Sequence, residues 1–121
     1  MTDAADPIAA LTRRLIEFRD ARDWRQFHGL KDLMLSAGVE AGELLELAQW
    51  KTEDDLETAL GDPAFRERLA DEVADVFIYL LLICERSGID LAAAAAAKIA
   101  KNDAKYPVEK ARGNARKYTE L

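Results

Sequence analysis

The chain has 121 residues, a length that fits one domain and leaves no room for a second. Half of its residues are hydrophobic and a third are charged, which excludes collagenous, low-complexity and disordered classes. The 17 basic and 23 acidic residues give a net charge of −6, so a general attraction for nucleic acid phosphates is also excluded.

Cysteine usage and hydropathy indicate the compartment. Cys84 is the single cysteine, so no intramolecular disulfide can form, which is typical of a reducing environment. The longest apolar run, residues 76–84, is far shorter than the roughly 20 residues that span a bilayer. No basic-then-apolar signal stands at the N-terminus. We therefore expect a cytoplasmic protein that has no contact with a membrane.

Helix start and stop signals predict an all-α fold. Asp6-Pro7 and Asp62-Pro63 each combine a capping carboxylate with a proline at the first helical position, and Gly88 is a typical helix stop. No segment alternates as a strand would. The predicted helices are residues 7–22, 31–50, 53–60, 63–87 and 91–105. We expect a bundle of four main helices with one short extra helix, in a single domain of residues 1–121 whose residues 108–121 are a candidate extended arm.

Two of these helices carry more apolar surface than one chain readily covers. Residues 63–87 are apolar on nearly every side, and residues 92–97 are all alanine. Because exposed apolar surface of this extent marks an interaction site, we expect a homo-oligomer.

Four acidic residues form two pairs in the predicted helices 31–50 and 63–87, both of which are strongly apolar. Glu40 and Glu43 are three residues apart, as are Glu72 and Asp75, so each pair shares a helix face. One alternative is that these acids lie on a solvated face and form surface ion pairs. If the apolar helices bury them instead, each uncompensated carboxylate costs several kcal/mol. We therefore expect the two helices to face each other and the four acids to share a cation. Such an all-oxygen set suits Mg²⁺, with Mn²⁺ as a substitute, whereas Zn²⁺ favours His or Cys and a di-iron site uses E-x-x-H.

Aromatic and basic residues extend this pattern. Trp50 is seven residues past Glu43, and Tyr79 is four past Asp75, so each pair has an aromatic residue further along the expected face. The last helix adds donors suited to phosphate or base at Lys98, Asn102, Lys105 and Tyr106. A metal ion, aromatic rings and lysine side chains together suit the binding of a nucleotide. The alternatives are core packing for Trp50 and Tyr79, and neutralisation of a helix C-terminus for the lysines.

The acidic motif resembles a known signature. E-x-x-E, 28 intervening residues and E-x-x-D is similar to the signature of the MazG-like all-α nucleoside triphosphate pyrophosphohydrolases. Within that superfamily the chain resembles the dCTP pyrophosphatase branch over roughly residues 11–121. The matching stretches are RDWRQFH, VEAGELLELAQWK, DEVADVFIYLL, the run from Lys98 to Pro107, and ARKYTEL.

The resemblance assigns roles to these positions. It implies Glu40, Glu43, Glu72 and Asp75 as Mg²⁺ ligands, and a tetramer built from dimers. Trp24, Trp50 and Tyr79 would line the base pocket, although Trp24 could equally be a helix-packing plug. Lys98, Asn102, Lys105 and Tyr106 would contact phosphates or sugar. Where relatives carry a histidine on the first helix this chain has Leu15, which leaves the pyrimidine preference open.

The resulting prediction is an Mg²⁺-dependent enzyme of nucleotide-pool sanitation. It would hydrolyse a pyrimidine triphosphate, best dCTP or a 5-modified dCTP, to the monophosphate and pyrophosphate. Glu40 or Glu43 would orient or deprotonate the attacking water. Two alternatives stay open: a pyrophosphatase acting on dUTP or several triphosphates, and a non-enzymatic, metal-binding helical interaction module.

Overall fold

The structure is a computed structural model that describes residues 6–121; the first five residues of the predicted domain lie outside the described part. The chain divides into two compact units, Met1–Gly88 and Ile89–Leu121. Helices and two short 3₁₀ turns are the only regular elements of residues 6–121, which confirms the all-α class. Within these residues, no helix is long and apolar enough to cross a membrane.

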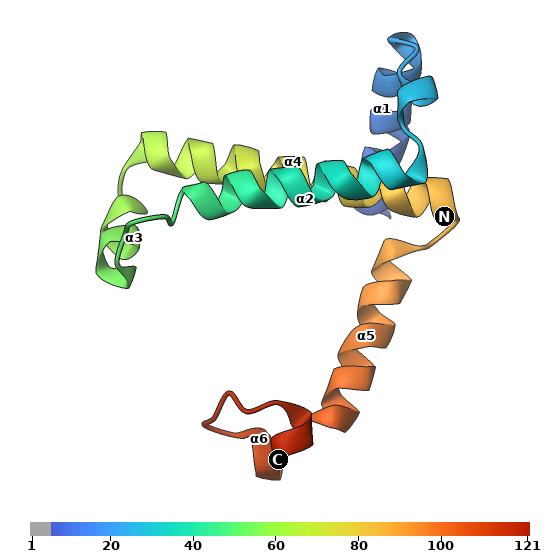
Figure 1. The fold of residues 1–121 in the computed structure, drawn as a ribbon. Coiled ribbons are helices and arrows are strands. Elements are labelled where there is room, and N and C mark those ends of the chain that lie inside the picture. The colour runs from blue at the N-terminus through green and yellow to red at the C-terminus, as the bar shows by residue number, and fades with distance from the viewer. Residues whose placement is uncertain (1–5) are drawn as a thin grey trace. The chain divides into compact units, whose positions relative to one another are not determined.

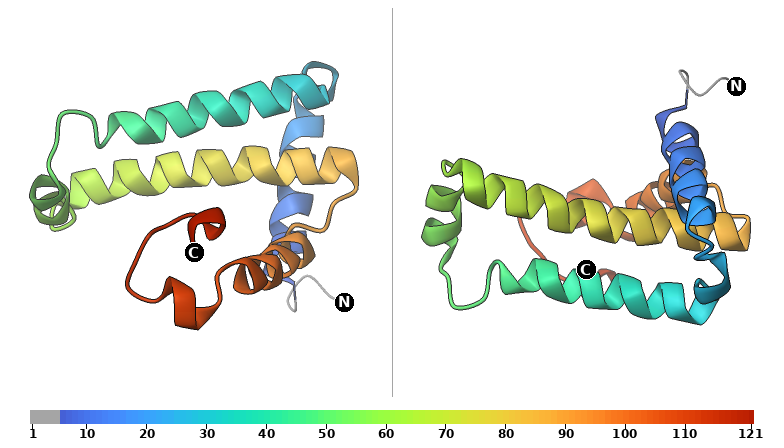
Figure 2. Two further views of the ribbon diagram at one scale, coloured as in Figure 1. Left: turned by 60° about the horizontal axis from the view of Figure 1, so that its bottom comes forward. Right: turned by 90° about the horizontal axis from the view of Figure 1, so that it is seen from above.

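The first unit is built on an antiparallel helix pair. α2 (Leu30–Glu46) and α4 (Pro63–Ser87) lie side by side along most of their length (Figure 1). α1 (Pro7–Ala21) crosses α4 near the C-terminal end of α4 (Figure 2). The 3₁₀ turn η1 (Arg25–Phe27) links α1 to α2, and the short helix α3 (Glu53–Ala59) links α2 to α4.

Local capping explains where these helices begin. The Asp6 carboxylate accepts the Ala9 N–H at 3.1 Å, and Asp62 does the same for Ala64 at 3.0 Å. Thr52 and Asp55 form a reciprocal capping box at the start of α3. α4 ends at Gly88, whose φ of +69° is the left-handed conformation that glycine adopts without strain.

The second unit contains α5 and the C-terminal segment. α5 (Leu91–Lys105) is capped by Asp90, as the sequence predicts. The tail is not extended throughout, because it forms the short helix α6 (Val108–Ala111) and the 3₁₀ turn η2 (Tyr118–Glu120). Tyr118 packs edge-on against Tyr106 at 6.1 Å, which folds the end of the chain back toward the end of α5.

One predicted boundary is wrong. The sequence places the end of the second helix at Trp50, but α2 ends at Glu46 and residues 47–50 form tight turns. The N–H groups of Leu47, Ala48 and Gln49 each bond to a carbonyl three residues back, as in the tightened end of a helix. Trp50 then takes a φ of +66°, which no helical residue has.

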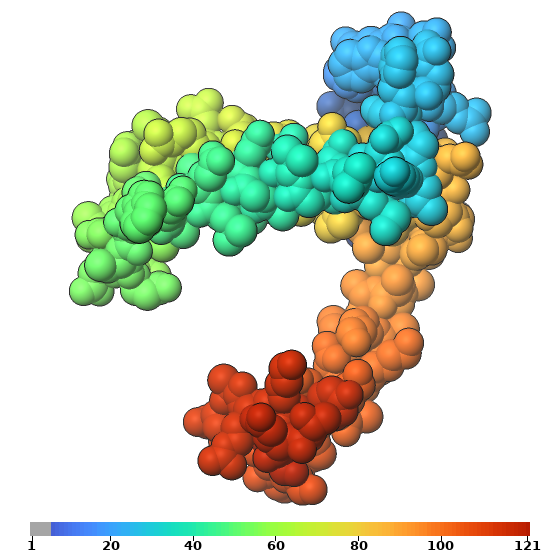
Figure 3. Space-filling view, in the orientation of Figure 1, coloured from blue at the N-terminus to red at the C-terminus, as the bar shows by residue number. Residues whose placement is uncertain are grey.

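The described core is small. Its most buried apolar residues are Leu33, Phe65, Leu81 and Leu82, all in α2 and α4. By contrast, Val39 is 61% exposed and Leu45 is 71% exposed on α2. In the space-filling view α2 forms the front of the first unit, with α4 behind it (Figure 3). The two central helices therefore bury one face against each other and leave apolar side chains of α2 open.

Candidate metal centre

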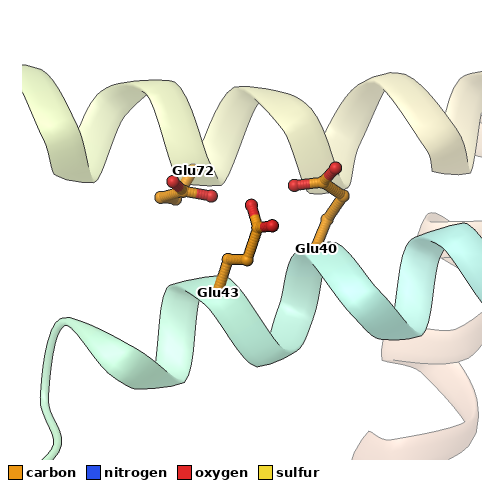
Figure 4. Close-up of side chains that lie close together, drawn as sticks. All are labelled: Glu40, Glu43 and Glu72. Carbon is orange, nitrogen blue, oxygen red and sulfur yellow. The ribbon is translucent and has the colours of Figure 1, made fainter.

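Three carboxylates converge between α2 and α4. Glu40 and Glu43 point from α2 toward Glu72 on α4 (Figure 4). One oxygen from each lies within 4.8 Å of the others, so a single ion could touch all three. The predicted meeting of the two acidic helix faces is therefore found for these three residues.

The antiparallel pairing of the helices produces this geometry. Glu40 and Glu43 are almost one turn apart, so both project from the same side of α2. The α2 face is packed on α4, which leaves Glu40 and Glu72 partly buried and Glu43 exposed. The cluster is thus open to solvent through Glu43 and closed on the side of the helix interface.

Two oxygens of these carboxylates lack the partners that burial requires. Oε2 of Glu40 and Oε2 of Glu72 are buried without a hydrogen-bond partner. None of the ion pairs within residues 6–121 includes a member of the trio. An oxygen of a carboxylate that is removed from water without a donor or cation is costly, and a bound cation would satisfy both oxygens. The residues present therefore fit a hard divalent cation, for which carboxylates are the preferred ligands.

The pKa values reflect this crowding. The pKa of Glu40 is raised from 4.5 to about 7, first because its protonated carboxyl shares a hydrogen bond with Glu43, then because of desolvation and the neighbouring negative charges. The pKa of Glu72 is raised by desolvation first and then by repulsion from Glu43. Without a cation the site therefore favours protons on its carboxyl groups.

Two further predicted residues lie on the α4 side of this centre. Asp75 is outside the three-residue cluster, but its charge contributes to the raised pKa values of Glu40 and Glu72. Tyr79 is partly buried one turn beyond Asp75 on the same side of α4. Both thus belong to the helix face that carries Glu72.

Trp50 is not on the α2 face that carries Glu43. Because α2 ends at Glu46, the seven-residue spacing does not describe one helix, and the interpretation of Trp50 as a member of that face is wrong. The Trp50 side chain is 93% exposed on a residue in the left-handed region, an uncommon conformation for a bulky side chain. The neighbouring Lys51 ammonium lies 5.2 Å from the centre of the buried Phe65 ring.

Trp24 and Leu15 lie on the α1 side of the first unit. Trp24 follows the end of α1, with its ring 5.6 Å from that of Phe18. Leu15 lines a groove of about 580 Å³ between α1 and α4, together with Phe77 and Leu81. At 100° per residue, Leu81 points 180° away from Glu72 on α4. Within one chain, therefore, the groove and the carboxylates occupy opposite faces of α4.

The remaining predicted site residues belong to the second unit. Lys98 and Asn102 are exposed on α5, and Lys105 ends that helix. The Lys105 ammonium lies 4.8 Å from the centre of the Tyr118 ring, and Tyr106 packs against the same ring. Sequence reasoning missed Tyr118 as a neighbour of these two residues, since only the folding of the tail brings it there.

Sequence reasoning also missed the ion pairs of a buried arginine. Arg19 is only 5% exposed, and its guanidinium contacts Glu85 of α4 at 3.2 Å and Asp20 at 2.9 Å. Arg19 and Glu85 are 66 positions apart, so no local spacing could reveal the pair. It ties the end of α1 to the end of α4.

Comparison with known proteins identifies the family. The sequence model of the MazG-like family matches residues 35–121 of this chain. The chain belongs to the MazG-like family. The matched segment contains all four predicted metal ligands and runs through both compact units of this MazG-like chain.

Individual relatives extend the match. dCTP pyrophosphatase 1 from Homo sapiens is 42% identical over 117 residues, which cover 96% of this chain and 69% of that protein. The Bos taurus protein of the same name is 40% identical over 119 residues, covering 98% of this chain and 70% of the relative. These alignments also cover most of the stretch before residue 35, where Trp24 and Leu15 lie and the MazG-like family match does not reach.

A solved structure supports the fold. The crystal structure of a pyrophosphatase from Archaeoglobus fulgidus aligns with a TM-score of 0.76 and 38% sequence identity, covering 82% of this chain and 91% of that one. A MazG-like pyrophosphatase fold is therefore established for this chain. These relatives favour an enzyme over the alternative of a non-enzymatic interaction module.

Proposed function

We propose that this MazG-like chain, a nucleotide pyrophosphohydrolase, acts on dCTP or a 5-modified dCTP and releases the monophosphate and pyrophosphate. The observation that carries the proposal is the trio Glu40, Glu43 and Glu72, with its two buried, unpartnered oxygens. The proposal for the base is supported by relatives that are 40–42% identical over nearly the whole chain and are named dCTP pyrophosphatase 1.

Mg²⁺ is the proposed cofactor, and Mn²⁺ its substitute. Glu40, Glu43, Glu72 and Asp75 would hold it, and their oxygen-only donor set supports a hard cation. When bound, the ion supplies neutralisation of phosphate charge and a lowered pKa of coordinated water.

The chain's own carboxylates have a second role in the proposed reaction. Glu40 or Glu43 accepts a hydrogen bond from the attacking water and takes its proton. The water oxygen forms a bond to the α-phosphorus while the bond from that phosphorus to the α–β bridging oxygen breaks. The products are the nucleoside monophosphate and pyrophosphate, which leaves with the bridging oxygen.

The substrate contacts are proposed from the residue types at the matching positions. Trp24, Trp50 and Tyr79 are assigned to the base, because flat aromatic faces stack on bases. Exposure of about 43% for Trp24 and 93% for Trp50 supports rings available to a ligand. The phosphates and sugar are assigned to donors of the second unit, namely Lys98, Asn102, Lys105 and Tyr106.

We further propose a homo-oligomer, a tetramer built from dimers, in which residues 1–121 act as one domain. Apolar side chains of α2 that are more than half exposed, such as Val39 and Leu45, support an interface there. On α5, Ile99 is likewise exposed. A cytoplasmic location, where nucleotide pools lie, completes the proposal.

A substrate panel tests the function. Pyrophosphate release is measured for each common ribo- and deoxyribonucleoside triphosphate and for 5-methyl-dCTP, with Mg²⁺ and with EDTA. The expected result is the highest kcat/KM for dCTP or 5-methyl-dCTP and no turnover in EDTA. Highest activity on dUTP, or equal activity on all triphosphates, would overturn the base assignment, and undiminished turnover in EDTA would overturn the metal assignment.

A further inference from the structure

The ring of Trp24 is held in place by residues of its own turn. About 43% of the residue is exposed, so burial in a core does not fix its orientation. Its partners are the Phe18 ring, which it meets edge-on at 5.6 Å, and the Arg22 guanidinium at 5.9 Å. Edge-to-face ring pairs at this separation are favourable beyond the area that they bury.

The backbone of this turn is fixed by a helix-ending motif. The Trp24 N–H donates to the Arg19 carbonyl, five residues back, and the Asp23 N–H donates to the Asp20 carbonyl, three residues back. Asp23, the residue before Trp24, has a φ of +53°. These are the two bonds and the left-handed residue of a Schellman motif. The Phe18–Trp24 ring contact is the apolar contact that commonly accompanies that motif.

Two side chains reinforce the motif. The Gln26 amide donates to the Asp23 carbonyl at 3.1 Å and to the Asp23 carboxylate at 3.0 Å. Arg19, whose carbonyl accepts the Trp24 N–H, is itself anchored to Glu85 of α4 through its buried side chain. The backbone of Trp24 is thereby fixed relative to the end of α4.

The Arg22 side chain fixes the Phe18 ring, against which the Trp24 ring packs. Its guanidinium carbon lies 3.7 Å from the centre of the Phe18 ring, and its Nη1 donates to the Phe18 carbonyl at 2.9 Å. A guanidinium that is stacked on a ring and hydrogen-bonded at the same time has little freedom. Phe18 is therefore held by Arg22, and Trp24 is held against Phe18.

We propose that Arg22 is a positioning residue for substrate binding: with Phe18 it fixes the exposed Trp24 ring before the nucleotide arrives. This inference rests on the proposed function, in which Trp24 stacks on the base. A side chain that is already ordered loses less rotamer freedom when a ligand binds, so the arrangement favours binding. Since Trp24 would contact the base and not the reacting phosphorus, loss of Arg22 affects KM and leaves kcat unchanged.

The test uses the full-length protein with Arg22→Ala and Arg22→Lys. For Arg22→Ala, KM for dCTP is expected to rise about fivefold with kcat within about twofold of wild type. Arg22→Lys keeps the charge without the planar stack, so its KM should lie between the two. The control is Arg25→Ala, which removes an exposed arginine of the same turn whose guanidinium, within residues 6–121, stacks on neither ring, and its KM should match wild type.

A second measurement reads the ring without substrate. In a Trp50→Phe background Trp24 is the only tryptophan, and quenching of its fluorescence by acrylamide should increase on Arg22→Ala but not on Arg25→Ala. Unchanged quenching would overturn the positioning role, and increased quenching with unchanged KM would overturn its link to binding. If the wild-type protein hydrolyses no triphosphate, the proposed function fails, whereas quenching still reports whether Arg22 holds the ring.

Discussion

The carboxylate centre and the Trp24 turn differ in whether their polar groups have partners within the chain. Between α2 and α4, three carboxylates crowd within 4.8 Å and two of their oxygens have no partner. At the end of α1, the Trp24 N–H, the Arg19 guanidinium and the two aromatic rings all have partners within the chain. The difference indicates that the first region needs a ligand to be satisfied, whereas the second is organised without one.

Removing a charge from the carboxylate centre should have the largest effect. Glu43→Gln is expected to lower kcat at least about 100-fold, because a metal ligand or the water-orienting group is lost. The protein should stay folded, and at pH 8 without metal its Tm should rise, since one of three mutually repelling charges is gone. Pyrophosphate release and thermal unfolding in EDTA are the measurements.

Glu46→Gln is the matched control for this variant. Glu46 continues the three-residue spacing on α2 but lies outside the cluster, so its kcat should stay within about twofold of wild type. A Glu43→Gln protein that keeps full turnover, or an equal loss in both variants, would contradict the assignment of the centre.

The unsatisfied character of the centre also predicts a dependence on pH. In the metal-free protein the pKa of Glu40 is raised from 4.5 to about 7, so the folded state binds a proton that the unfolded state has released over that range. The free energy of unfolding should therefore fall as pH rises from about 4.5 to about 7. The raised pKa of Glu72 acts in the same direction.

Mg²⁺ should reverse this effect. At a concentration about 100 times its Kd, the ion is expected to raise the free energy of unfolding by about 2.7 kcal/mol at pH 8. Urea unfolding at pH 5 and pH 8, in EDTA and in Mg²⁺, gives the four values needed. Metal-free stability that rises between these pH values, or no gain from Mg²⁺, would show that the carboxylates are not the crowded site described.

The Trp24 turn is tested by removing the ion pair between Arg19 and Glu85, which links it to α4. Glu85→Gln removes the charge that faces the buried Arg19 and should lower the free energy of unfolding by about 1–2 kcal/mol in a urea titration. Asp20 stays paired with Arg19, which limits the loss. Glu67→Gln, at an exposed position of the same helix, should change stability by less than about 0.5 kcal/mol. Equal effects of the two variants would mean that the pair contributes nothing.

The two regions also differ in how far the sequence predicts them. The starts of α3, α4 and α5 are read from Thr52, Asp62 and Asp90 because a cap is a local interaction. The carboxylate pairs are equally readable, since i, i+3 spacing fixes a helix face and acids are costly on apolar helices. What is local in the chain is therefore largely predictable. The meeting of α2 and α4 follows from it, because the two acidic faces are best satisfied by one shared cation.

The unpredicted features depend on the left-handed conformation or on distance in the chain. Trp50 and Asp23 both have a positive φ, and neither is a glycine, the residue type from which a positive φ could be predicted. The Arg19–Glu85 pair and the packing of Tyr118 on Tyr106 join residues that no spacing relates. The sequence misplaces the end of α2 because residues 47–50 have the composition of a helix and no glycine marks the left-handed conformation of Trp50.

The smallest expected effect contrasts the left-handed residues that follow α1 and α4. Asp23 carries a negative charge at the C-terminal end of α1, where the helix dipole disfavours it, so Asp23→Asn should raise the free energy of unfolding by about 0.5 kcal/mol. Gly88 has a φ of +69° with open space around it, so Gly88→Ala meets no clash and costs only the left-handed backbone, about 1 kcal/mol. Urea titrations of both variants measure the contrast. A stabilising Gly88→Ala would show that the residue after α4 does not need its left-handed conformation.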